Sequence, residues 1–199
     1  MGNEDIFYDA VHAFKVLLKK KYFFEFKTMN SIERIKLIFF EENFYHIAGI
    51  QKLDDINELF KNSNKSLFFK SLLKKTNATN KKVNLICSSI RFDEIIDRLE
   101  SIMVFESNLK MHYDNGKYIK CYKGSLLFSS QIKYDYVFII NNNDDKQYHY
   151  FVKKKNNDEY VIESTFINDT DNYWKGQKLM ILNKIDLEED GKINNIFKK

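Results

Sequence analysis

Histidine is the side chain best suited to acid–base chemistry near neutral pH. The chain has four histidines, and none has a metal-ligating partner three or four residues further along: His12, His46, His112 and His149. The spacing of a preformed metal face on a helix is therefore missing, and we expect no metal site. His46 is the strongest candidate for proton transfer, because Gly49 lies one helical turn away. Glycine costs about 1 kcal/mol in a helix relative to alanine, which indicates a helix end or a close backbone approach. From the residues alone, a half-buried histidine that satisfies a hydrogen bond is the more frequent alternative.

Further candidates lie in the C-terminal third of the chain. Alternation in the strand-like run 161–167 places Thr165 on a polar face with Glu163, although an ordinary exposed sheet face gives the same pattern. Tyr173 and Gln177 are four residues apart, so one helical turn would bring them together. They could hold a base or a phosphate, or only cap the final strand.

Two cations from the first half of the chain complete the set. Lys52 is close to two helical turns after His46 and could contact phosphate, but a solvated surface lysine is the more common interpretation. Arg98 is spaced to pair with Glu94 on the surface of a helix, which is the simplest interpretation of it from spacing alone.

Several common catalytic signatures are absent from the sequence. There is no phosphate-binding GxxxxGK[ST] loop, no dinucleotide-binding GxGxxG, no HExxH and no GxSxG. We therefore expect chemistry that needs neither a metal nor a cofactor.

Composition predicts a folded protein of the reducing cytoplasm. Of 199 residues, 44% are hydrophobic and 30% charged, which suits one packed core with a solvated surface. The net charge of +4 is too small to indicate nucleic-acid binding by itself. Cys87 and Cys121 are far apart, which favours neither zinc nor a disulfide framework. No secretory signal and no apolar run of roughly 20 residues is present, so we expect no membrane segment.

The order of expected elements predicts an α+β fold. A helix at 4–20 and a hairpin over 22–40 precede helices expected at 43–51, 55–61, 64–75 and 92–106. Short strands separated by Asn, Asp and Gly turns follow, at 117–122, 125–132, 134–141, 147–155, 160–167 and 178–185. We expect a helical N-terminal half packed on a C-terminal twisted antiparallel sheet. The expected divisions are an N-terminal extension (1–40), the main domain (41–187) and a loose polar tail (188–199).

Four blocks of sequence, spread over most of the chain, carry recognisable motifs. They are Phe44-Tyr-His-Ile-Ala-Gly-Ile-Gln-Lys-Leu53, Ile95-Ile-Asp-Arg-Leu99, Ile132-Lys-Tyr-Asp-Tyr136, and Ser164-Thr-Phe166 followed by Tyr173-Trp-Lys-Gly-Gln177. Together they resemble the fourth phage family of BECR domains, the barnase–EndoU–colicin–RelE superfamily. One departure is Ile167, where that family has a second phenylalanine. The resemblance spans residues 40 to 185.

This resemblance implies a BECR-like fold and a metal-independent endoribonuclease, in which the 2′-OH of RNA attacks the adjacent phosphate. Such a reaction needs a base, an acid and donors to the phosphorane oxygens. The matched blocks imply catalytic roles for His46, Thr165 and Tyr173. They imply substrate binding by Lys52, Arg98, Ser164, Lys175 and Gln177. The expected partners are RNA and a cognate antitoxin or phage-derived protein, because many such domains are toxins or phage-defence effectors.

Two other classes of function remain open from the sequence. The first is a non-catalytic module, such as an antitoxin or a phage-defence adaptor, that binds a partner through the same fold. The second is a metal-dependent DNA nuclease, because Glu25-Phe-Lys27 follows Asp9 in the order of an Asp…Glu-x-Lys site. Dependence on a divalent metal would identify this second class.

Overall fold

A computed structural model describes residues 2–28, 30–56, 58, 60, 62–74, 76–115, 119–123, 132–141, 146–168 and 173–198, without the side chains of 111–115. The helical elements are α1 (Asn3–Leu17), α2 (Asn43–Ile47), the 3-10 helix η1 (Ile50–Lys52), α3 (Lys65–Leu72), α4 (Asn77–Cys87) and α5 (Asp93–Asn115). The strands are β1 (Lys20–Lys27), β2 (Ile32–Leu37), β3 (Lys120–Lys123), β4 (Tyr136–Asn141), β5 (Gln147–Lys154), β6 (Glu159–Ile167), β7 (Lys178–Glu189) and β8 (Lys192–Lys198).

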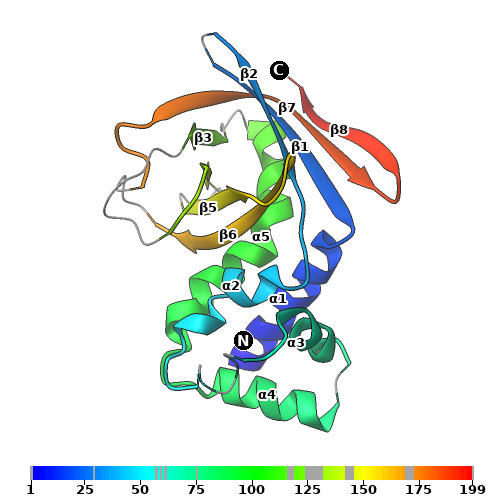
Figure 1. The fold of residues 1–199 in the computed structure, drawn as a ribbon, viewed down its shortest axis with the longest axis vertical. Helices are drawn as coiled ribbons and strands as arrows, with labels where there is room; N and C mark the ends of the chain where they lie inside the picture. The colour runs from blue at the N-terminus through cyan, green and yellow to red at the C-terminus, as the bar shows by residue number, and fades with distance from the viewer. Residues whose placement is uncertain are drawn as a thin grey trace.

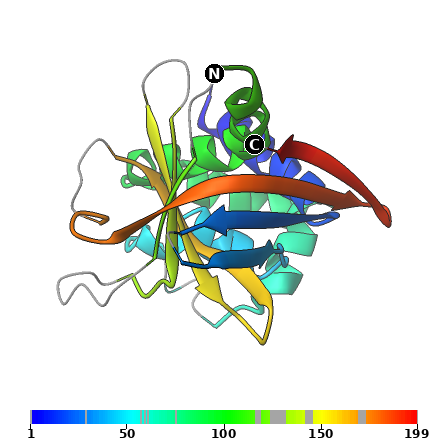
Figure 2. The ribbon, with the colours of Figure 1, turned by 90° about the horizontal axis from the view of Figure 1, so that it is seen from above.

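Seven of the strands form a closed barrel (Figures 1 and 2). Their order is β1-β2-β6-β5-β4-β3-β7, and pairing of β7 with β1 closes the ring. All these pairings are antiparallel except β2 with β6, which are parallel over two residue pairs. β8 adds to the free edge of β7, outside the ring. Figure 1 shows α1 to α4 gathered at one end of the barrel, with α5 running from that end along the strands.

Aromatic side chains link the barrel interior to the helices. Alternation along β1 turns Tyr22, Phe24 and Phe26 inward, and all three are buried. On α5, Phe105 meets the Tyr22 ring at 5.5 Å and the Tyr150 ring at 5.0 Å between centroids. α5 therefore covers the interior with the same apolar face that packs on α1, and one continuous core holds the barrel and helices together.

The expected fold of a helical half on an open antiparallel sheet is wrong. The hairpin expected as an N-terminal extension supplies β1 and β2, two of the seven barrel strands. Closure depends on β1 meeting β7, some 160 residues later in the chain, over the eight residue pairs from Lys20↔Glu189 to Lys27↔Ile181. Local periodicity carries no information about such distant pairing, so the strands were predicted but the barrel was not.

Several element boundaries also differ from expectation. The helix expected at 43–51 ends at Ile47, and Gly49 separates it from η1. α4 was not expected, whereas α5 continues nine residues beyond the expected end at 106. The strand expected at 125–132 lies outside the described residues except for Ile132, which is not in a strand. Residues 192–198, expected in a loose tail, form β8. In the described part of the chain, no helix combines the length and apolar character needed to cross a bilayer.

Candidate anion-binding site

Arg98 is a buried cation without a carboxylate partner in the described structure. It lies on α5 and is only 9% exposed. Its Nη1 donates to Ser164 Oγ at 2.7 Å, and its Cζ lies 5.5 Å from the centroid of the Phe166 ring. Burial lowers the pKa of the Arg98 guanidinium, while the nearby Tyr173 phenol raises it. The predicted pairing with Glu94 is made instead by Arg91, at 2.6 Å.

Gly49 provides the space in which the Arg98 side chain lies. Its φ of +79° is a left-handed conformation that side chains disfavour. A Cβ at this position would lie 2.4 Å from Arg98 Cδ and 3.1 Å from Ile95 Cγ2. The glycine was expected to mark a helix end or a close approach, and the structure has both. The side chain that fills the space beside Gly49 is Arg98, and not His46.

A stretch of strand edge without a strand partner lies beside Arg98. β6 pairs with β2 only through Glu159 and Tyr160, so its later residues have no neighbouring strand on that side. α2 and α5 both pack against β6. The guanidinium therefore extends past the edge to Ser164, whose side chain faces outward.

A β-bulge in β6 decides which of its side chains face outward. Ser164 pairs with Phe151 and Ile162 with Val152, which leaves Glu163 as the extra residue. Beyond the bulge the alternation is reversed, so Thr165 shares the inner face with Ile162. Thr165 is fully buried, and its Oγ1 donates to the carbonyl oxygen of His149 at 2.9 Å. The structure thus places the Thr165 hydroxyl on the opposite face of the sheet from Ser164.

Tyr173 and Gln177 lie together, as their spacing predicts. Gln177 Nε2 donates to the Tyr173 carbonyl oxygen at 2.8 Å and to the Tyr134 hydroxyl at 2.9 Å. Tyr134 in turn donates to the Tyr173 carbonyl oxygen at 2.7 Å. The Tyr173 ring packs edge-on against Phe166, with centroids 5.3 Å apart. This turn covers the outer face of the sheet next to Arg98.

His46 lies at the other side of the same stretch of β6. It is exposed, whereas Phe44, Tyr45 and Ile47 of the same helix α2 are buried. One side of the ring is against protein, and this loss of solvation lowers its pKa, with Lys65 lowering it further and Glu163 raising it. The charge of Glu163, the bulged residue, acts on His46, and Arg98 donates a hydrogen bond to the next residue, Ser164. Sequence reasoning missed Glu163, because no local pattern marks the bulge.

The remaining predicted residues are less closely connected. Lys52, in η1, is exposed, and its side chain forms no hydrogen bond or ion pair within the described part of the chain. Lys175 is exposed in the turn that carries Tyr173. The structure therefore connects four predicted residues, Arg98, Ser164, Tyr173 and Gln177, whereas His46 is linked to them only through the charge of Glu163.

His149 is a second histidine near this site, on the outer face of β5. It is fully buried, with its ring roughly parallel to those of Phe151 and Phe166. Neither ring nitrogen has a hydrogen-bond partner among the described residues. Burial lowers the pKa of His149 to about 4, so the ring is neutral near pH 7. A lone histidine between aromatic residues in a strand gave no sequence signal for this environment.

The residues of the alternative nuclease site are otherwise engaged. Glu25 accepts hydrogen bonds from Arg34 at 3.1 Å and from Asn183 at 2.6 Å. Asp9 lies on α1, at the helical end of the molecule (Figure 1). Over the described residues, no group of three or more histidine, cysteine, aspartate or glutamate side chains could hold a metal ion.

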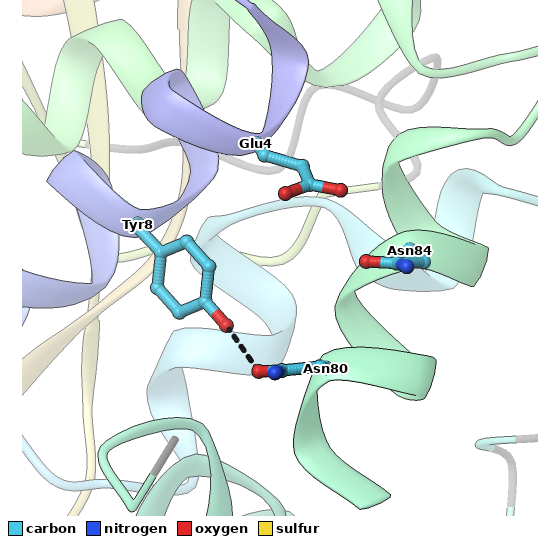
Figure 3. Close-up of a pocket in the computed structure, with 4 residues that line it drawn as sticks. All are labelled: Glu4, Tyr8, Asn80 and Asn84. Atoms are coloured by element: carbon cyan, nitrogen blue, oxygen red, sulfur yellow. Dashed lines mark hydrogen bonds between the residues drawn. The ribbon is translucent and has the colours of Figure 1, made fainter. Parts of the chain in front are cut away.

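Two hollows lie away from the Arg98 site. One, of about 360 Å³, lies between α1 and α4 and is lined by Glu4, Tyr8, Asn80 and Asn84 (Figure 3). Its Tyr8 hydroxyl donates to Asn80 Oδ1 at 3.3 Å. A larger hollow of about 550 Å³ lies over Phe23 and Glu25 of β1. None of the residues predicted for the ribonuclease site lines either hollow, although Glu25 of the alternative nuclease site lines the larger one.

Comparison with known proteins gives no match for this chain: no protein-family model, curated protein or solved structure matches it.

Proposed function

We propose that this protein is a metal-independent endoribonuclease that holds an RNA phosphate at Arg98 and uses His46 for proton transfer. The proposal is supported chiefly by the buried Arg98 guanidinium, which has a hydroxyl and an aromatic face around it but no described carboxylate. A role as a toxin or phage-defence effector, with an antitoxin as partner, stays a prediction from the sequence resemblance.

A phosphate suits the surroundings of Arg98. A buried charge is costly unless an opposite charge or several hydrogen bonds compensate for it. In the described structure Arg98 donates one side-chain hydrogen bond, to Ser164, of the five that a guanidinium can donate. A phosphate oxygen pair accepts the remaining donors in the bidentate geometry that distinguishes arginine from lysine.

Proton transfer falls to His46 and Tyr173. Since burial lowers the pKa of His46 below its ordinary 6.5, its ring is neutral at pH 7 and can accept the proton of a 2′-OH. Glu163 stabilises the imidazolium that forms. The Tyr173 phenol, which interacts with Arg98, is the candidate donor to the leaving 5′-oxygen. Ser164 and Arg98 would donate to the phosphorane oxygens.

The decisive experiment compares H46Q with H12Q, in which an exposed histidine of α1 is changed in the same way. H46Q should cut RNA cleavage by on the order of 10²–10⁴-fold, the usual contribution of one proton-transfer group. Its melting temperature should stay parental, because the side chain is exposed. H12Q should cleave like the parent, and all cleavage should survive excess EDTA. Loss of activity on chelation with rescue by Mg²⁺ would refute the metal-independent mechanism.

RNA binding without cleavage is a second candidate function. The Thr165 hydroxyl is buried on the inner face and His149 is fully buried, so His46 is the only exposed histidine beside Arg98 in the described structure. A parent protein that binds RNA but leaves it intact, while R98M no longer binds, would establish this function instead.

A further inference from the structure

The register of the barrel places one outward-facing residue from each of six strands in a single row. The row crosses the strands in the order β1, β7, β3, β4, β5 and β6. Its residues, each the Cα partner of the next, are Lys27, Ile181, Lys120, Ile139, His149 and Phe166. Adjacent strands lie about 4.8 Å apart, so this row extends roughly 24 Å around the outside of the barrel. It ends at Phe166, against which the Arg98 guanidinium lies.

A second row runs beside the first and is mostly apolar. It passes from Leu179 on β7 through Tyr122, Val137 and Phe151 to Ser164, which accepts the Arg98 hydrogen bond. The turn at 173–174 covers its middle. Tyr173 packs on Phe151, and Trp174 stacks on Tyr122 with centroids 5.1 Å and 5.0 Å apart respectively. Val137, Phe151, Ile139 and His149, in the middle of the two rows, are buried, so the accessible surface there is the half-buried turn that carries Tyr173 and Trp174. This turn and the two ends of the rows together form the strip from β7 to Arg98.

The end of the strip furthest from Arg98 is exposed, apolar and basic. Ile181 is 50% and Leu179 48% exposed, and the two lie on the same face of β7. Lys27 and Lys120 flank Ile181 and are exposed, and neither forms an ion pair with a described carboxylate. Lys120 Nζ lies 6.0 Å from the Trp174 ring. Here the cations lie beside exposed aliphatic side chains and the half-buried Trp174. Cations next to aromatic rings are features with which proteins hold single-stranded nucleic acid.

We propose that this strip, defined by Lys27, Ile181, Lys120, Trp174 and Arg98, is the binding track for single-stranded RNA. Lys27 and Lys120 contact backbone phosphates, bases stack at Trp174, and the strand reaches the Arg98 site past Tyr173. The occupant is single-stranded because paired bases cannot stack on protein side chains. This inference rests on the proposed function for the position of the reacting phosphate, and it adds the path by which the substrate arrives.

Trp174 is the only tryptophan of the chain, so it reports directly on this track. Oligouridine of about 12 nucleotides, within the range of single-strand binding sites, should quench its fluorescence on titration. The test variant is K27Q/K120Q. The control is K81Q/K82Q, which makes the same change in charge on two exposed lysines of α4, at the opposite end of the molecule from β7 and β3 in Figure 1.

K27Q/K120Q should bind oligouridine roughly tenfold more weakly than the parent at low salt, because two phosphate contacts are lost. The slope of log affinity against log salt should fall in magnitude by about 1.4, or 0.7 for each lost contact with a single strand. K81Q/K82Q should bind like the parent. If K27Q/K120Q and K81Q/K82Q bound oligouridine with the same affinity and salt dependence, the track would be overturned. Binding of oligouridine without a change in Trp174 fluorescence would also overturn it.

Two further outcomes separate this inference from the proposed function. If R98M and H46Q lose cleavage while K27Q/K120Q binds and cleaves like the parent, the nuclease stands and the track is wrong. If K27Q/K120Q weakens quenching but the parent never cleaves RNA, the track stands and catalysis is wrong. Binding to phosphatidylserine vesicles but not to oligouridine, lost in K27Q/K120Q, would assign the strip to a lipid surface and overturn the inference.

Discussion

Replacing Gly49 with alanine tests whether close packing holds Arg98 in place. The added Cβ would lie 2.4 Å from Arg98 Cδ, whereas ordinary contact begins at 3.4 Å, so the arginine must move by about 1 Å. A shift of that size stretches the 2.7 Å bond from Nη1 to Ser164 Oγ beyond hydrogen-bonding range. The change should therefore damage both the fold and the anion site.

Two terms contribute to the loss of stability in G49A. The left-handed backbone, with φ of +79°, costs a non-glycine residue about 1–2 kcal/mol. Overpacking against Arg98 and Ile95 adds roughly 1–3 kcal/mol. G191A isolates the first term, because Gly191 has φ of +75° and its Cβ would meet no atom within 4 Å. The difference between the two variants thus measures the contact with Arg98.

Urea unfolding and oligouridine binding of both variants complete the experiment. G191A should lose about 1–2 kcal/mol and bind RNA like the parent. G49A should lose clearly more and also bind RNA more weakly, because Arg98 is displaced. Equal losses of stability with parental RNA binding in both variants would refute the reasoning, since Arg98 would then not depend on the space beside Gly49.

Two further predictions concern the buried sheet beside the site. Burial depresses the pKa of His149 from 6.5 to about 4. As the pH falls, the His149 side chain is therefore protonated in the unfolded chain before it is protonated in the folded protein, and the folded state loses stability between about pH 6.5 and pH 4. Between about pH 7.5 and pH 5 the loss should be about 2 kcal/mol, and H149F should remove it from urea unfolding curves; an unchanged pH dependence would contradict the assigned environment. T165V should lose about 1 kcal/mol of stability with the bond to the His149 carbonyl oxygen and still cleave RNA. Cleavage lost at parental stability would instead return Thr165 to the catalytic residues.

Local patterns in the sequence determined most of the secondary structure and part of the site. The β-prone residues of 22–40 predicted a hairpin, and this segment forms the paired strands β1 and β2. The four-residue spacing of Tyr173 and Gln177 predicted their contact. These successes share one cause: periodicity and short spacings act over a single turn or strand, where backbone geometry alone decides which side chains meet.

Only the tertiary structure decided the closure of the barrel and the environment of Arg98. The four-residue spacing of Glu94 and Arg98 suggests a surface ion pair, but Arg98 is instead buried against Ser164. Which of the two environments Arg98 has depends on the unpaired edge of β6. Thr165 and Ser164 exchange faces because one inserted residue, Glu163, reverses the alternation. Closure arises from pairing between strands distant in sequence, and the bulge from the register of the neighbouring β5–β6 pair, in which a shift of one residue moves every later side chain to the other face of the sheet.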